Sequence, residues 1–271
     1  MDEMKQALQQ EVAHYAATAP GGAVGPETTD DPALQGMRYF TAPLFGFAAA
    51  EDPLFAALRA PEAVGEQLIL PQEWLPGAKT VISFFLPFSE QVRRSNLAQP
   101  DLPSPEWLYA RIEGQAFLLE ICRLIADWLQ QRGFSALIPA VDPRMQVFHA
   151  PKFTSSWSER HAAYVAGLGT FGLSCGLITE QGMSGRFGSV ITDAVFSPDQ
   201  RPYDDPYAYC NHCGVCVRRC PVAAISLRAG KDHQICSDYL DQMKEHFQPR
   251  YGCGKCQSGV PCEKGIPQRI R

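Results

Sequence analysis

The sequence predicts an α+β protein with two unequal parts, an α/β sandwich-like domain over residues 1–205 and a small cysteine-rich domain over residues 206–271. The length of 271 residues is enough for one large and one small domain. Eight of the ten cysteines lie in the second range. The net charge also changes there, from −10 before Cys210 to +5 from Cys210 onward. These differences in composition predict a domain boundary close to residue 205.

The composition predicts a cytoplasmic chain that does not enter a membrane. Hydrophobic residues make up 45% of the chain and charged residues 20%, which is usual for a soluble protein with a substantial core. The apolar stretch at residues 68–75 is too short and too polar to cross a bilayer. Residues 1–17 form a polar amphipathic pattern with acidic residues first, which is unlike a secretory signal. In a reducing compartment the cysteines are not expected to form structural disulfides.

The first 133 residues contain three clear elements. Residues 2–17 predict a helix, which a Pro/Gly-rich loop follows at residues 20–36. Residues 79–88 are a short apolar run rich in β-formers and predict a buried strand. The longest helix is predicted from Pro105, after a serine that can cap it, to a stop near Gly133. Its apolar residues recur at helical spacing, and they include Cys122, which is therefore expected to be a buried small hydrophobe.

Residues 134–195 are predicted to contain shorter helices and strands and longer loops. Residues 134–141 predict a strand, and residues 143–157 predict a long aromatic and basic loop of the kind that is often functional. Residues 156–159 (SWSE) fit a capping box that opens a helix. Two candidate strands, residues 176–179 and 186–195, are predicted to form a hairpin.

A glycine-rich turn precedes that hairpin. Gly167, Gly169 and Gly172 match the spacing G-x-G-x-x-G, which marks a dinucleotide site when a strand precedes it and a helix follows. Here a predicted helix precedes the motif instead. The glycines are therefore interpreted as ending that helix and letting backbone pass close to a neighbouring group.

The clustered cysteines allow two kinds of metal site. A zinc ribbon would use two C-x2-C pairs, at residues 210–213 and 253–256, and would leave four cysteines unused. The run from Cys210 to Pro221 has the spacing C-x2-C-x2-C-x3-C-P of bacterial ferredoxins, in which the fourth cysteine ligates the other cluster. Two [4Fe–4S] clusters need eight thiolates, and eight are present. The sequence therefore favours a bacterial-ferredoxin-like domain with two [4Fe–4S] clusters, and zinc stays the alternative.

The order of the later cysteines adds a family resemblance. A lone Cys236, the pair Cys253 and Cys256, and then Cys262 follow the ferredoxin run, and AGLGTFG stands upstream. This arrangement resembles the epoxyqueuosine reductase family and its relatives the reductive dehalogenases, over residues 75–265. The resemblance implies a cobalamin-dependent reductase whose N-terminal domain is related to flavin- and cobalamin-processing folds. It also implies a low-potential electron donor of the ferredoxin or flavodoxin type as partner.

The resemblance assigns ligands to each cluster. The cluster nearer the corrinoid would be held by Cys210, Cys213, Cys216 and Cys262. The other cluster would be held by Cys220, Cys236, Cys253 and Cys256. Gly167, Gly169 and Gly172 would bring backbone close to the macrocycle, and His149 in the long loop is a candidate to reach cobalt.

A reduction that consumes protons needs a proton donor near the cofactor. The resemblance points to Asp142, although it stands some eleven residues earlier than the family's acid. Glu159, His161 and Tyr164 on the next predicted helix are the local candidates. Each also has a purely structural interpretation, as a helix cap or a packing residue.

The expected substrate is a small molecule or a corrinoid, and tRNA is not expected. The charge of −10 before Cys210 is unlike a nucleic-acid surface, and the helical repeats that read tRNA in many family members are missing after the cysteines. Two functions stay open. One is a corrinoid-dependent reductase, and the other is an electron-transfer or cofactor-handling protein that reduces a corrinoid or flavin carried by a partner.

Overall fold

A computed structural model describes residues 2–150 and 153–268, and an antiparallel four-stranded sheet lies at its centre. The strands lie in the order β1 (Leu44–Ala49), β2 (Thr80–Pro87), β8 (Gly185–Thr192) and β3 (Ala136–Leu137). All eight residues of β2 are buried, because strands pair with both of its edges and a hydrophobic core covers each face of the sheet. This confirms the buried strand predicted at residues 79–88.

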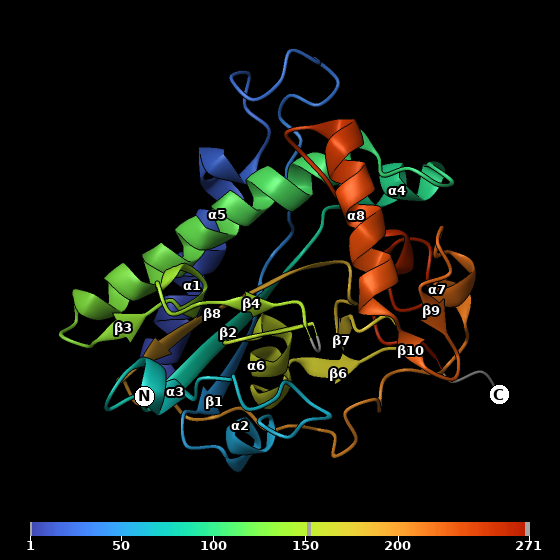
Figure 1. Cartoon of the computed structure of the whole chain (residues 1–271). Coiled ribbons are helices and arrows are strands. Elements are labelled where there is room, and N and C mark those ends of the chain that lie inside the picture. The colour runs from blue at the N-terminus through green and yellow to red at the C-terminus, as the bar shows by residue number, and fades with distance from the viewer. Residues whose placement is uncertain (1, 151–152, 269–271) are drawn as a thin grey trace.

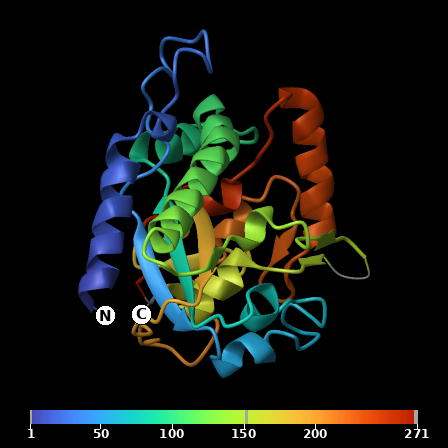
Figure 2. The same cartoon turned by 90° about the vertical axis from the view of Figure 1, so that its left-hand side faces the viewer.

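Helices cover both faces of this sheet (Figure 1, Figure 2). One face packs on α1 (Asp2–Thr18) and α5 (Pro105–Gln130). The other face packs on α2 (Pro53–Ala57), α3 (Pro71–Trp74) and α6 (Glu159–Val165). Successive residues of β2 point to opposite faces, so Ile82 belongs to the first core and Val81 to the second. The helices predicted at residues 2–17 and after Pro105 are confirmed, and Cys122 is fully buried, as predicted.

The mixed α/β character is confirmed, with smaller elements around the sheet. Before α6 these are η1 (Pro20–Gly22), α4 (Glu90–Ala98), η2 (Pro139–Val141), β4 (Val147–Phe148) and β5 (Thr154–Ser155). The cysteine-rich part contains α7 (Val215–Arg218), β9 (Ile225–Ser226), β10 (Gly230–Lys231), α8 (His233–Phe247) and η3 (Lys255–Gln257). Figure 1 shows α8 standing at one side of the molecule, beside α7, β9 and β10.

Three local predictions are wrong. The candidate strands of the predicted hairpin do not pair with each other, because β7 (Leu177–Thr179) pairs with β6 (Gly169–Phe171) and β8 joins the central sheet. The strand predicted at residues 134–141 has only two residues of sheet, since a 3-10 turn begins at Pro139. The predicted capping box does not form, because α6 begins only at Glu159 with Ser158 before it, and the Ser156 hydroxyl accepts from the Gln146 N–H instead. In the predicted long loop, residues 151 and 152 lie outside the described residues.

The cysteine-rich part packs firmly against the larger part. The Lys255 side chain is fully buried, and its Nζ donates to the carbonyl oxygens of Asn96 and Gln99, each at 2.8 Å. Near the β7–β8 connection, the backbone N–H of Met183 donates to the Cys262 carbonyl at 3.0 Å. Buried polar and apolar contacts therefore cross the boundary predicted at residue 205, and the division into two domains stays a prediction.

Candidate functional site

The first cysteine group consists of the thiols of Cys210, Cys213, Cys216 and Cys262. Burial, together with its three partner thiols, raises the pKa of Cys262 to about 12. All four cysteines line a space of about 340 Å³, counting the part open to solvent. The rest of its lining is mainly backbone and apolar side chains, among them Gly172, Leu173, Ile178, Met183 and Val260. Four thiols that line one mainly apolar space form a suitable cradle for a metal cluster, which is larger than a single ion.

The second cysteine group consists of the thiols of Cys220, Cys236, Cys253 and Cys256. Burial, together with Cys256 and Cys236, raises the pKa of Cys253 to about 12. Burial also raises the pKa of Cys256, and Cys236 and Cys220 add to that effect. The backbone N–H of Ala224 donates to the Cys220 sulfur at 3.2 Å, a contact of the kind that tunes cluster potentials. Since Cys256 also raises the pKa of Cys216, the two groups lie beside each other.

The chain around the thiols turns sharply where their spacing requires it. His212 lies between Cys210 and Cys213 with a φ of 52°, and Gly254 lies between Cys253 and Cys256 with a φ of 70°. A side chain on Gly254 would collide with the Trp107 ring. Within residues 2–150 and 153–268, no three His, Cys, Asp or Glu side chains converge closely enough to hold one metal ion. The structure brings the thiols into the same two groups that the resemblance implies, and their roles as ligands stay a prediction.

A second and larger hollow, here called the central pocket, adjoins the first cysteine group. It has a volume of about 950 Å³, counting the part open to solvent, and lies between α5, the start of β8, the start of α6 and η3. Its polar lining consists of Arg111, Gln115, Ser155, Ser158, Glu159, Arg160, Arg186 and Gln257. Met183 lines both this pocket and the space between the first four thiols, and its sulfur lies 3.2 Å from that of Cys262. One side chain therefore lies between the first cysteine group and the central pocket.

Glu159 is the buried acid of the central pocket. Neither of its carboxylate oxygens is accessible to solvent, and neither has a hydrogen-bond partner among the described residues. Burial raises the pKa of Glu159 to about 7, although the nearby Ser189 hydroxyl and Trp157 indole favour the charged form and lower it. The Trp157 indole N–H donates a hydrogen bond to the Ser189 hydroxyl at 2.9 Å. Near neutral pH this carboxyl can therefore hold or release a proton, as a general acid must.

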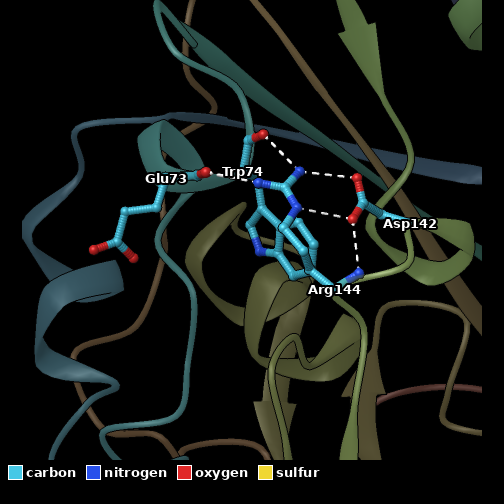
Figure 3. Close-up of polar contacts among 4 residues, drawn as sticks. All are labelled: Glu73, Trp74, Asp142 and Arg144. Atoms are coloured by element: carbon cyan, nitrogen blue, oxygen red, sulfur yellow. Dashed lines mark hydrogen bonds and ion pairs between the residues drawn. The ribbon is translucent and has the colours of Figure 1, made fainter.

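Asp142 has a different environment (Figure 3). Both of its carboxylate oxygens accept from the Arg144 guanidinium at 2.8 Å. Arg144 in turn donates to the carbonyl oxygens of Glu73 and Trp74, each at 2.9 Å, and its guanidinium lies over the Trp74 ring. The bonds from Arg144 lower the pKa of Asp142 to about 2, so this carboxyl is ionised near neutral pH. In this arrangement Asp142 anchors a loop and does not line the central pocket.

The remaining candidates do not line the central pocket, although His161 contacts Ser158 in its lining. His161 forms a hydrogen bond of 2.7 Å between its Nδ1 and the Ser158 hydroxyl, and its ring packs on Phe171. Tyr164 is buried and stacks on Tyr203. His149 follows β4 directly, is exposed and contacts Phe153. The interpretation of the glycine-rich turn as the end of a helix is confirmed.

Each glycine of that turn serves a different contact. Gly167 follows α6 with a φ of 83°, and a side chain on Gly169 would collide with Ile178 backbone on β7. Gly172 lines the space between the first four thiols. The sequence analysis did not identify Arg111, Arg186 or Met183, because nothing in the local sequence shows that they meet.

The chain is similar to epoxyqueuosine reductases, as the cysteine order indicated. It is 28% identical to the epoxyqueuosine reductase of Bacillus cereus over 209 residues, which cover 72% of this chain and 51% of that protein. It is also 33% identical over 107 residues to the methylamine utilization ferredoxin-type protein MauM of Paracoccus denitrificans, which covers 39% of this chain and 42% of that one. The chain thus spans about half the length of the curated relatives that it matches. No family model matches it.

Solved structures show the same fold. A structure of epoxyqueuosine reductase with an epoxyqueuosine-modified tRNA-Tyr stem loop matches with a TM-score of 0.55 and 22% identity, over 98% of this chain and 68% of that one. A catabolic reductive dehalogenase, NpRdhA, with 3-bromo-4-hydroxybenzoic acid matches with a TM-score of 0.53 and 19% identity, over 97% of this chain and 37% of that one. In the part of the chain that the structure describes, no helix is both long and apolar enough for a membrane span.

Proposed function

We propose that the chain is an iron–sulfur reductase in which two [4Fe–4S] clusters, one on each cysteine group, pass electrons towards the central pocket. The observation that carries this proposal is the arrangement of eight thiols in two adjacent groups of four, the first of which encloses a space that shares Met183 with the pocket. Similarity to epoxyqueuosine reductase and to a ferredoxin-type protein supports it. A low-potential protein of the ferredoxin or flavodoxin type would supply the electrons.

The residues present fit the groups that the proposal needs. The first cysteine group would hold one cluster in its apolar space, and the second would hold the other beside the Ala224 N–H. The clusters supply single electrons at low potential when bound, and a corrinoid supplies a metal that can deliver them to a substrate. One similar structure concerns B12-dependent dehalogenation, which supports a corrinoid here. The central pocket is the site that we propose for the corrinoid or the substrate.

The chain's own contribution to the reaction is a proton and a pocket lined mainly by polar side chains. Glu159 lies in the pocket with a pKa near 7 and no partner among the described residues, so we propose it as the proton donor. Asp142 would take that role only if its loop left Arg144 and moved to the pocket. The catalytic loop of the Bacillus subtilis epoxyqueuosine reductase has been seen swung out of its active site, so loop movement has a precedent in a similar protein.

Cluster content tests the proposal directly. Anaerobically purified protein should contain about eight iron and eight acid-labile sulfide per chain, and the colour should bleach with dithionite. Cys213→Ser and Cys253→Ser should each remove about half of the iron, because each breaks a different group. Cys122→Ala in the core of α5 is the matched control and should keep the full content. Zinc in place of iron, or an equal effect of all three changes, would end the proposal.

A second function is supported by the similarity to the ferredoxin-type protein MauM. In that case the chain would hand electrons to a corrinoid or flavin on a partner and would have no substrate of its own. Added cobalamin separates the two functions, because a reductase should bind it and change its absorption spectrum, whereas an electron carrier should not. Because one similar structure holds a tRNA stem loop, the expectation that tRNA is not a partner needs its own measurement by filter binding.

A further inference from the structure

We propose that the central pocket binds an anionic group, a phosphate or a carboxylate, on the ligand that occupies it. Arg111, Arg160 and Arg186 reach this pocket from α5, α6 and β8. Among the described residues, none of the three forms an ion pair. The inference rests on the proposed function in one respect, because it names the ligand class of the same pocket.

The three guanidinium groups are held close together by the fold. Arg111 and Gln115 are four residues apart on α5 and therefore face the same side of that helix. The Nε of Arg186 donates to the Gln115 amide oxygen at 2.6 Å, which leaves its other N–H groups for the pocket. Burial, together with the positive charges of Arg111 and Arg160, lowers the pKa of Arg186 to about 9. These cations therefore repel one another when the pocket is empty.

The rest of the lining does not neutralise them. Glu159 is the only acidic residue of the lining, and neither of its oxygens contacts an arginine. The Nε of Arg111 is buried without an acceptor, and its guanidinium lies 4.3 Å from the centre of the Tyr251 ring. The pocket thus carries a net charge of +2 when Glu159 is ionised and +3 when it is protonated. The planar fork of an arginine matches a carboxylate or a phosphate, and a ligand with such a group would supply the missing acceptors.

A structural alternative exists for two of the three residues. The thiols of Cys236 and Cys253 lie near Arg111, and that of Cys256 lies near Arg160, so these two arginines could offset the charge of metal-bound thiolates. Arg186 is different, because burial, Arg111, Arg160 and Tyr251 shift its pKa and no cysteine is among these causes. Arg186 is therefore the residue on which anion binding and charge compensation make different predictions.

The test uses the anaerobically purified, metal-loaded protein and inorganic phosphate or pyrophosphate, with calorimetry at low salt. The wild type should bind the anion saturably. Arg186→Gln should weaken binding by about 10- to 100-fold, because it removes a charged hydrogen-bond donor. Arg160→Gln, at an exposed position on α6, should weaken binding without endangering the fold. Arg94→Gln is the matched control, since Arg94 is an exposed arginine on α4 that pairs with Glu90 and does not line the central pocket.

The results separate this inference from the proposed function. Absence of saturable binding, or equal affinity in the wild type, Arg186→Gln and Arg160→Gln, would overturn the anion site. Protein without iron that still binds phosphate through Arg186 would overturn the redox function and leave the anion site standing. Competition locates the source of the anion. If cobalamin displaces phosphate but cobinamide, which lacks the phosphodiester, does not, the anionic group belongs to the nucleotide of a corrinoid. If neither displaces phosphate, the anionic group belongs to a substrate.

Discussion

Replacing Glu159 with glutamine should make the protein more stable at alkaline pH and leave it nearly unchanged at acidic pH. Burial raises the pKa of this carboxyl from 4.5 to about 7 in the folded chain. The folded protein therefore holds a proton that the unfolded chain releases between these two values. Stability contributed by this group is complete below pH 4.5, falls as the pH rises to about 7, and stays low above that.

The size of the effect follows from the same shift. A rise of this size corresponds to about 3 kcal/mol of unfavourable free energy at pH 8, which is an upper value because the group lines a pocket. Glutamine has nearly the same shape but no charge, so it avoids this cost. For a chain of this length, the melting temperature of Glu159→Gln should exceed that of the wild type by roughly 5 to 10 °C at pH 8. At pH 5 the two should melt within about 2 °C of each other.

Anaerobic thermal melts of the metal-loaded protein at pH 5, 6, 7 and 8 measure this difference. The control is Glu245→Gln on the exposed side of α8, which should melt like the wild type at every pH. An infrared carboxyl band that disappears with a midpoint near pH 7 and is missing in Glu159→Gln would report the same proton directly. If the difference in melting temperature is the same at pH 5 and pH 8, Glu159 does not titrate in this range and the proton-donor role fails.

Three further outcomes follow from individual contacts. Gly182→Ala should release iron from the first cysteine group, because a side chain there would collide with the Glu263 backbone beside Cys262. Gly36→Ala is the control, since Gly36 has a similar φ but open space around it. That change should keep the iron and lower stability by about 1 kcal/mol. Lys255→Met should destabilise the protein by about 2 to 3 kcal/mol in chemical unfolding, because it leaves the buried carbonyl oxygen of Asn96 without this donor and also removes the bond to the Gln99 carbonyl. Lys264→Met at an exposed site should be neutral. Asp142→Asn should lower the free energy of unfolding by less than about 1 kcal/mol, since the Asp142–Arg144 ion pair is partly exposed. A larger loss, measured by chemical unfolding, would contradict the description of this pair as a weak surface anchor.

The sequence predicted best those features that a short stretch of chain encodes by itself. The strand β2 and the helix α5 carry long apolar patterns, and both lie where they were predicted. The spacing of the cysteines between Cys210 and Pro221 is local in the same sense. It predicts that Cys210, Cys213 and Cys216 lie around one space, and all three line the space that Cys262 also lines. The assignment of Cys262 and of the second group came from the family resemblance, and the roles of all eight as ligands stay a prediction.

Features that depend on distant partners were not predictable in this way. The sequence near Leu177 is compatible with pairing to the strand before it or to the strand after it. In the structure β7 pairs with the preceding strand β6, while the following strand β8 inserts between β2 and β3. Glu159 has the sequence signature of a helix cap, and only the packing of α6 against the sheet shows that its carboxyl is buried. Arg111 and Arg186 are 75 residues apart, so their meeting in one pocket had no signal in the sequence.

The contacts of the cysteine-rich part predict that residues 206–271 will not form a working cluster domain when produced alone. Lys255 would lose its acceptors on α4, and the Arg250 side chain would lose the Glu113 carboxylate that it contacts at 2.8 Å. The first cysteine group would lose the packing of Ile178 and Met183. A small domain has little apolar core with which to compensate for such losses. Reconstituted segment 206–271 should therefore bind well under half of the iron that the full chain binds under the same conditions. A fully loaded segment with the spectrum of the full chain would show instead that the clusters need no support from the larger part.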